Sequence, residues 1–346
     1  MNLELLKAVL DGVPLPMLLI GSDERVRVAN SGATRLFGPG LEGRHYHIAL
    51  RQPDLLQCVS ETLANRVVRQ ARHVVASISG EQTYRVLSSP VSLENLAASL
   101  VSFVDITDVE QAGQIRRDFV ANVSHELRTP LTALLGFIET LRGAAREDPV
   151  ARDRFLSIME KEAGRMNRLV SDLLSLSRVE AEERVRPSER VNIVALVQSS
   201  VTALRPFATD RNVGLEILGE TTPVEIPADP DQIVQVLHNL IENAIKYGGP
   251  GKMVSVVIRR EPRDPALRAA AVRIDVIDRG DGIDSAHLPR LTERFYRIDS
   301  HRSREQGGTG LGLAIVKHII NRHRGRFRID SELGKGSQFS IILPEG

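Results

Sequence analysis

His125 and Glu126 are the residues whose types and position best suit group transfer. They lie in a segment, residues 109–141, whose apolar side chains recur at three- and four-residue intervals, as on one face of a helix. His125 is two residues from both Val123 and Leu127, about 200° around the helix from each, so its ring should face solvent. An exposed imidazole is a competent nucleophile near neutral pH, and the adjacent carboxylate could accept the released proton. Most lone surface histidines, however, have no function.

A second set of polar residues occupies a helix that should begin at Asp229, with Pro230 in its first turn. Asn239, Asn243 and Lys246 are spaced four and three residues apart and therefore share one face. Amide oxygens can ligate Mg²⁺ and an ammonium group can meet phosphate, which is the chemistry that a nucleoside triphosphate requires. The alternative is an ordinary amphipathic helix with a solvated polar face.

Two glycine-containing segments follow this helix. The first, Asp278-Arg279-Gly280-Asp281-Gly282, comes after an expected strand and offers a carboxylate that could accept a hydrogen bond from an exocyclic amine. The second, residues 307–313, runs into a predicted helix over 314–321, where backbone amides can hold phosphate oxygens. No Gly-Lys-Ser/Thr sequence follows, so the second segment is not a Walker A loop.

These motifs resemble those of one family. Residues 119–131, Phe-Val-Ala-Asn-Val-Ser-His-Glu-Leu-Arg-Thr-Pro-Leu, resemble the phospho-acceptor box of sensor histidine kinases. The asparagine helix, the Asp-x-Gly-x-Gly turn, a phenylalanine segment at 293–297 and the Gly-x-Gly-x-Gly loop resemble, in this order, their Bergerat-type ATPase. The resemblance covers residues 110–346. It implies autophosphorylation of His125 from ATP, with Glu126 as general base, and transfer to a response regulator. It also implies that Thr129 positions water for dephosphorylating that partner.

The same resemblance assigns the nucleotide site. It implies that Asn239 and Asn243 hold Mg²⁺, and that Asp278 reads the adenine amine. The other implied nucleotide-site residues are Lys246 and Tyr247 beside the nucleotide, Gly280 and Gly282 shaping the adenine pocket, and Gly308, Gly310 and Gly312 in the phosphate loop. Residues 283–307 would form a lid, in which Arg297 would steady the γ-phosphate. His301, Arg302 and Arg304 fit a solvated loop equally well.

Residues 116–119 and 136–141 are most similar to phosphate-regulon sensor kinases, which predicts a role in phosphate-starvation signalling. Members of that subfamily usually begin with membrane helices. In this sequence no apolar run approaches the ~18 to 20 residues that span a bilayer. We therefore expect a cytoplasmic protein without a membrane span in this chain, associated with a membrane only through a partner or as part of a longer protein.

The spacing of apolar runs and turns predicts a multidomain α+β protein. Residues 1–108 should form a small α/β module, with antiparallel strands at 16–20, 26–28 and 98–106 and helices at 33–37 and 54–71 on one side. Its final segment, residues 103–108, resembles the end of a PAS domain, where an Asp-Ile-Thr step leads into the next helix. Residues His45, Tyr46, His47 and Phe37 fit no haem or flavin signature, so a signalling role without a ligand is favoured.

Residues 109–180 should form two antiparallel helices joined near 147–149. Two helices cannot bury such apolar stripes alone, so we expect two copies to pair into a dimeric four-helix bundle. A charged, proline-containing linker, 180–190, leads to residues 190–346, which should form an α/β sandwich with the ATP site. The expected strands lie at 213–218, 253–260, 272–278, 326–330 and 337–343.

The amino-acid composition argues against some classes of function for this protein. The 45 Lys and Arg residues balance 44 Asp and Glu, and there is no Trp and only four Tyr, so nucleic acid is not an expected partner. The single cysteine, Cys58, excludes an internal disulfide and should be a buried helix residue. Two other classes stay open: an ATP-driven clamp or chaperone of the same Bergerat fold, which the His125 segment argues against, and a signalling scaffold that only binds nucleotide.

Overall fold

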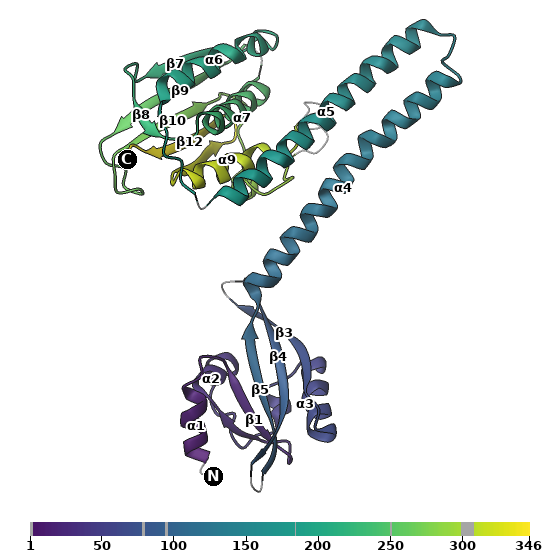
Figure 1. Cartoon of the computed structure of the whole chain (residues 1–346), viewed down its shortest axis with the longest axis vertical. Helices are drawn as coiled ribbons and strands as arrows, with labels where there is room; N and C mark the ends of the chain where they lie inside the picture. The colour runs from purple at the N-terminus through teal and green to yellow at the C-terminus, as the bar shows by residue number, and fades with distance from the viewer. Residues whose placement is uncertain (1–2, 78–79, 94–95, 184, 250, 299–307) are drawn as a thin grey trace. The chain divides into compact units, whose positions relative to one another are not determined.

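The computed structural model describes residues 3–77, 80–93, 96–183, 185–249, 251–298 and 308–346. The chain divides into two compact units, Met1–Ala121 and Asn122–Gly346. The long helix α4, Thr107–Arg142, contributes to both (Figure 1). Within the described residues, no helix is both long enough and apolar enough to cross a membrane.

The first unit is built on a five-stranded antiparallel sheet with the order β2-β1-β5-β4-β3. The strands are β1 (Met17–Gly21), β2 (Val26–Ala29), β3 (Arg69–Ser77), β4 (Gly80–Leu93) and β5 (Leu96–Asp105). The sequence did not indicate β3 and β4, and the helix expected over 54–71 is too long. Helix α3, Pro53–Asn65, ends because Arg66 adopts a left-handed conformation with φ 56°. The chain is then free to enter β3.

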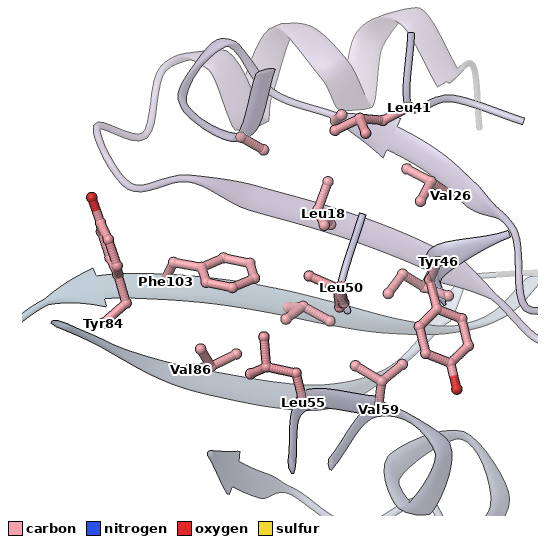
Figure 2. Packing of buried hydrophobic residues seen from close by; sticks show 14 residues of the cluster. Leu18, Val26, Leu41, Tyr46, Leu50, Leu55, Val59, Tyr84, Val86 and Phe103 are labelled. Carbon is pink, nitrogen blue, oxygen red and sulfur yellow. The ribbon is translucent and has the colours of Figure 1, made fainter. Parts of the chain in front are cut away.

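The sheet of the first unit buries side chains on both faces. Leu18 and Ile20 of β1 lie in the main core with Val86 and Phe103, beneath α2 (Ser31–Phe37) and α3 (Figure 2). Leu19 points to the opposite face, where helix α1, Leu3–Asp11, covers it through Leu10. The prediction of helices on one side only is therefore wrong. Consecutive apolar residues in β1 require cover on both faces, because side chains alternate along a strand.

Two smaller features complete the first unit. A 3₁₀ helix, Tyr46–Ile48, places Tyr46 in the core. Cys58 is buried in α3, as predicted, and burial raises the pKa of its thiol.

The helical hairpin consists of α4 and α5, Pro149–Glu182. Asp148 caps α5, because its Oδ1 accepts hydrogen bonds from the amides of Val150 and Ala151, each at 3.0 Å. The turn predicted at 147–149 is thereby confirmed. Helix α4 continues through Pro130. Many apolar side chains of the hairpin remain exposed, among them Leu131, Leu135 and Ile138.

The C-terminal part forms an α/β sandwich, as expected. Its sheet has the order β11-β12-β10-β9-β7, in which only the β7–β9 pair is parallel. The strands are β7 (Gly214–Gly219), β9 (Met253–Glu261), β10 (Ala271–Ile277), β11 (Arg326–Glu332) and β12 (Gly336–Pro344). Helices α6 (Ile193–Thr209), α7 (Pro230–Gly248) and α9 (Gly312–Arg322) pack against it (Figure 1). A two-stranded sheet, β6 (Arg190–Asn192) with β8 (Glu225–Pro227), and a 3₁₀ helix, Leu288–Arg290, complete this part.

Candidate nucleotide and phosphoryl-transfer site

A cavity of about 440 Å³ lies in the C-terminal unit, between α7, the loop after β10, the start of α9 and helix α5. It brings together most of the residues predicted to bind nucleotide: Asn239, Asn243, Lys246, Tyr247, Asp278, Gly282, Arg297, Gly308, Gly310 and Gly312. Gly280 is not among the lining residues. It lies against the backbone of α7, where an added Cβ would come within 2.2 Å of the Tyr247 carbonyl oxygen.

Helix α7 presents its polar face to this cavity because its apolar face is fully buried. Leu237, Leu240 and Ile241 have no exposed surface. The helix begins where Asp229 accepts a hydrogen bond from the Gln232 amide at 3.2 Å, with Pro230 in the first turn. Both features agree with the start expected from the sequence.

The donor groups on α7 suit a hydrated magnesium ion. Asn239 and Asn243 offer amide oxygens, and Glu242, which also lines the cavity, offers a carboxylate. Lys246 pairs with Glu242 at 2.9 Å. No cluster of three or more His, Cys, Asp or Glu that could hold a metal occurs within the described ranges. Mg²⁺ commonly binds through few protein oxygens together with water and substrate phosphates, so this set fits it.

Asp278 is a buried carboxylate at the cavity wall, only 4% exposed. Its Oδ1 accepts hydrogen bonds from the amides of Gly280 at 2.8 Å and Ser337 at 3.3 Å. Burial outweighs these bonds and raises the pKa of Asp278. An amino group donating to this carboxylate would stabilise its charged form.

Two glycines of the predicted site have backbone conformations that other residues rarely adopt. Gly282 has φ 70°, and a Cβ there would lie 2.1 Å from the carbonyl oxygen of Glu332. Gly310 has φ 75°, and its Cβ would lie 2.9 Å from Cα of Phe295. Both positions therefore require glycine for close packing and for positive φ.

Helix α5 contributes residues that the motifs did not indicate: Arg168, Ser171 and Asp172 line the same cavity. Asp172 Oδ2 and Thr309 Oγ1, in the glycine-rich loop, form a hydrogen bond of 2.6 Å. Burial raises the pKa of Asp172, and the nearby charge of Glu242 adds to this effect. No motif marks Asp172 in the sequence, since Leu169, Leu173 and Leu176 keep their helical spacing past it.

His125 is exposed on α4, as the helical spacing predicted, and does not line the cavity. Thr129 Oγ1 donates to the His125 carbonyl oxygen at 3.1 Å. The Glu126 carboxylate pairs with Arg165 of α5 at 2.7 Å and with Arg297 at 3.6 Å. Arg297 also donates to the Gly308 carbonyl oxygen.

The described part of the predicted lid, residues 283–298, supplies Arg297 and Tyr296 to the cavity wall. The residues His301, Arg302 and Arg304 lie outside the described residues.

Comparison with known proteins assigns both parts of this arrangement. A family model for the His Kinase A (phospho-acceptor) domain matches residues 115–182. A second, for histidine kinase-, DNA gyrase B- and HSP90-like ATPases, matches residues 228–346. The phosphate regulon sensor protein PhoR of Pseudomonas aeruginosa is 40% identical over 236 residues, which is 68% of this chain and 52% of that protein.

The sensor protein kinase WalK of Staphylococcus aureus (strain Newman) is 33% identical in an alignment 351 positions long, which covers 99% of this chain and 56% of the relative. The chain thus spans about half the length of these curated relatives. Among solved structures, histidine kinase ThkA in complex with response regulator protein TrrA gives a TM-score of 0.54 at 21% identity. It covers 98% of both chains, and this likeness concerns the fold alone. From its two matched domains and its relatives, the chain belongs to the family of two-component sensor histidine kinases.

Proposed function

We propose that this protein uses Mg-ATP to phosphorylate His125 and then passes the phosphoryl group to an aspartate of a response regulator. The observation that carries the proposal is the occurrence, in one compact unit, of an exposed His125 and of a cavity lined by all but one of the predicted nucleotide residues. The proposed organisation is a sensor module over 1–108, a phosphotransfer hairpin over 109–180 and a catalytic domain over 190–346.

In the proposed transfer, a ring nitrogen of His125 attacks the γ-phosphorus while the bond to the bridging oxygen breaks, and ADP leaves with that electron pair. The ring proton passes to Glu126. Asn239 and Asn243 would hold Mg²⁺, which neutralises phosphate charge when bound. Because His125 does not line the cavity, the ATPase fold has to move toward α4 before transfer.

The ion pairs of Glu126 bear on this step. Arg165 and Arg297 both pair with the carboxylate that is proposed to accept the ring proton, and so they occupy it. We infer that transfer takes place after Arg297 has left Glu126 for the γ-phosphate, which is the role that the resemblance implied. Release of Glu126 and charge stabilisation at phosphorus would then accompany the same movement.

The hairpin supports a homodimer and a regulator partner. Its exposed apolar side chains need a second copy to be covered, and ThkA, which shares the fold, was solved with a response regulator. The exposure of Thr129, one turn after His125, supports the proposal that its hydroxyl orients water for regulator dephosphorylation. Because the chemistry consumes ATP, we propose that these domains work in the cytoplasm.

The proposal also covers how the first unit passes on a signal and in which signalling pathway the protein acts. In the first unit, Asp105 Oδ1 accepts hydrogen bonds from the amide of Thr107 at 2.9 Å and from its hydroxyl at 2.6 Å. This ties β5 to the first residue of α4 and supports a PAS-like module that acts on that helix. The likeness to PhoR supports a phosphate-signalling role, while WalK proteins are equally close. Relative rates of transfer to regulators of the two kinds would separate these pathways, and we expect faster transfer to the phosphate-regulon type.

The central test is incubation of the purified protein with γ-labelled ATP and Mg²⁺, beside a His125→Gln variant, followed by acid and alkali treatment. We expect acid-labile, alkali-stable label that is absent from the variant. Label that persists in the variant would contradict the proposal. An unlabelled protein that still hydrolyses ATP, with unchanged activity in His125→Gln, would indicate a clamp instead. Binding of nucleotide without hydrolysis or label would indicate a scaffold.

A further inference from the structure

Helix α9 ends in two buried polar residues. Arg322 is 8% exposed and His323 is 1% exposed. Arginine is rarely buried to this extent unless its charge is paired, and a buried imidazole requires partners for both ring nitrogens. Both residues meet this requirement through contacts that reach two other helices.

The first of these helices is α7. His323 Nε2 accepts a hydrogen bond from the Asp229 amide at 3.0 Å, while Nδ1 donates to the Ile319 carbonyl oxygen at 2.8 Å. Arg322 Nη1 donates to Asp229 Oδ2 at 3.1 Å. The other carboxylate oxygen of Asp229 caps α7. The end of α9 thus holds the first residues of the helix that carries the proposed magnesium ligands.

A second contact joins the same two helices near the nucleotide. Asn239 Nδ2 donates to the Gly312 carbonyl oxygen at 3.5 Å, and a Cβ on Gly312 would lie only 3.3 Å from Asn239 Oδ1. Asp229 and Asn239 are separated by about 15 Å of helix, as are Gly312 and Arg322, at ~1.5 Å per residue. Helices α7 and α9 therefore run antiparallel, and the two ends of α9 contact the start of α7 at Asp229 and its middle at Asn239. We expect a shift at Asp229 to be carried to Asn239 along this pair.

The third partner of Arg322 is the end of the hairpin. Arg322 Nη2 pairs with Glu182 Oε2 at 2.9 Å, and Nε donates to the Val185 carbonyl oxygen at 3.1 Å. Glu182 is the last residue of α5. A single buried guanidinium consequently bridges the end of the phosphotransfer hairpin and the start of α7.

We propose that Arg322 is a positioning residue for the nucleotide site: it joins the end of α5 to the start of α7 and thereby sets how Asn239 and Asn243 stand toward Mg-nucleotide. The inference rests on the proposed function of the cavity as a Mg-ATP site. It predicts that the affinity for Mg-nucleotide depends on a contact with the hairpin that lies one helix length away from the phosphates.

The test measures the dissociation constant of a fluorescent ATP analogue for the full chain, with Mg²⁺ and with a chelator, well below the unfolding temperature. We expect Arg322→Gln to weaken Mg-dependent binding about 3- to 10-fold, a size typical of mutations that alter coupling between sites. Affinity in the chelator should match that of the wild type, because the proposed effect acts through the metal ligands. Arg328→Gln removes an arginine that pairs with Asp330 on the surface and should change neither value.

A second variant tests the same contact in case Arg322→Gln folds poorly. Glu182 is half exposed, so Glu182→Gln should fold. It should weaken Mg-dependent binding about twofold, and it should add nothing in the Arg322→Gln background because both act through one contact. Equal Mg-dependent affinity of wild type, Arg322→Gln and Glu182→Gln would overturn the inference, as would equal losses with Mg²⁺ and with chelator. A wild-type protein that binds Mg-nucleotide but is never labelled on His125 would refute the proposed function. The inference about Arg322 would then still be decided by the measured affinities.

Discussion

The helical hairpin and the ATPase fold differ in how far their apolar residues are buried. In α7, Leu237 is completely buried, and so are its apolar neighbours on the same face. In α4, Leu135 is 55% exposed and Leu131 is 49% exposed. The ATPase fold therefore closes its own core within one chain, whereas the hairpin leaves an apolar surface that one chain does not cover.

This difference indicates which surface would form the proposed dimer. Burial of an exposed leucine contributes roughly 1.5 to 3 kcal/mol, so several such side chains on two long helices can hold a dimer together. The ATPase fold needs no such contribution, so the movement proposed for transfer would leave its core intact. A stable dimeric axis and a movable catalytic fold are what the proposed transfer to His125 requires.

The largest expected effect concerns the hairpin surface. Leu135→Asp places a charge on the surface that we expect to be covered by the second copy, and burying an unpaired carboxylate is prohibitively costly. We expect loss of the dimer at micromolar concentration, measured as molar mass by light scattering, with nucleotide binding retained. Leu218→Asp, a matched change of an exposed leucine in β7, should leave the dimer intact. A dimer that survives Leu135→Asp would show that the hairpin stripe is not the interface.

The next effect sharpens the comparison within one chain. Leu237→Ala removes a fully buried side chain and should lower the free energy of unfolding of the ATPase fold by about 2–5 kcal/mol, measured by urea denaturation. Leu131→Ala, made in the Leu135→Asp background so that no partner covers it, should cost less than about 1 kcal/mol. Equal costs would mean that the hairpin buries its leucines without a second copy.

The sequence predicted much of the candidate site because its residues occur in short motifs. Asn239 and Asn243 share a face by helical spacing, and Gly282 and Gly310 occupy turns that exclude other residues. Asp172 could not be assigned in the same way, because which residue of α5 meets the glycine-rich loop depends on tertiary packing. The contacts of Arg322 with Glu182 and Asp229 were likewise hidden, since the three residues lie far apart in sequence.

The fold showed the same division between local and distant information. The turn at 147–149 and the long helices followed from local spacing and were confirmed. The end of α3 was misplaced, because the helical pattern continues beyond Arg66 while the backbone conformation at that residue ends the helix. Helix α1 was not predicted, because the reason for its position is that it covers the second face of the sheet, and this requires the tertiary structure to be known.

The smallest expected effect is the dependence of stability on pH, which should differ between the buried core of the ATPase fold and the exposed hairpin. Burial lowers the pKa of His323 in the folded protein, so its contribution to stability is fully present above the unfolded-state pKa, near ~6.5, and is lost as the pH falls through the lower folded-state value. Protonation would also remove the acceptor of the Asp229 amide. We expect the free energy of unfolding of the ATPase fold to fall between pH 7.5 and pH 5.5, and to fall less in His323→Gln. Asp172 and Asp278 have raised pKa values, so their effect on the free energy of unfolding has the opposite dependence on pH. This effect is the same in wild type and His323→Gln and cancels when the two are compared. The matched control is His125→Gln, which makes the same change on the exposed surface of the hairpin. An identical pH dependence in wild type and His323→Gln would show that the hydrogen bond to α7 does not depend on the neutral ring.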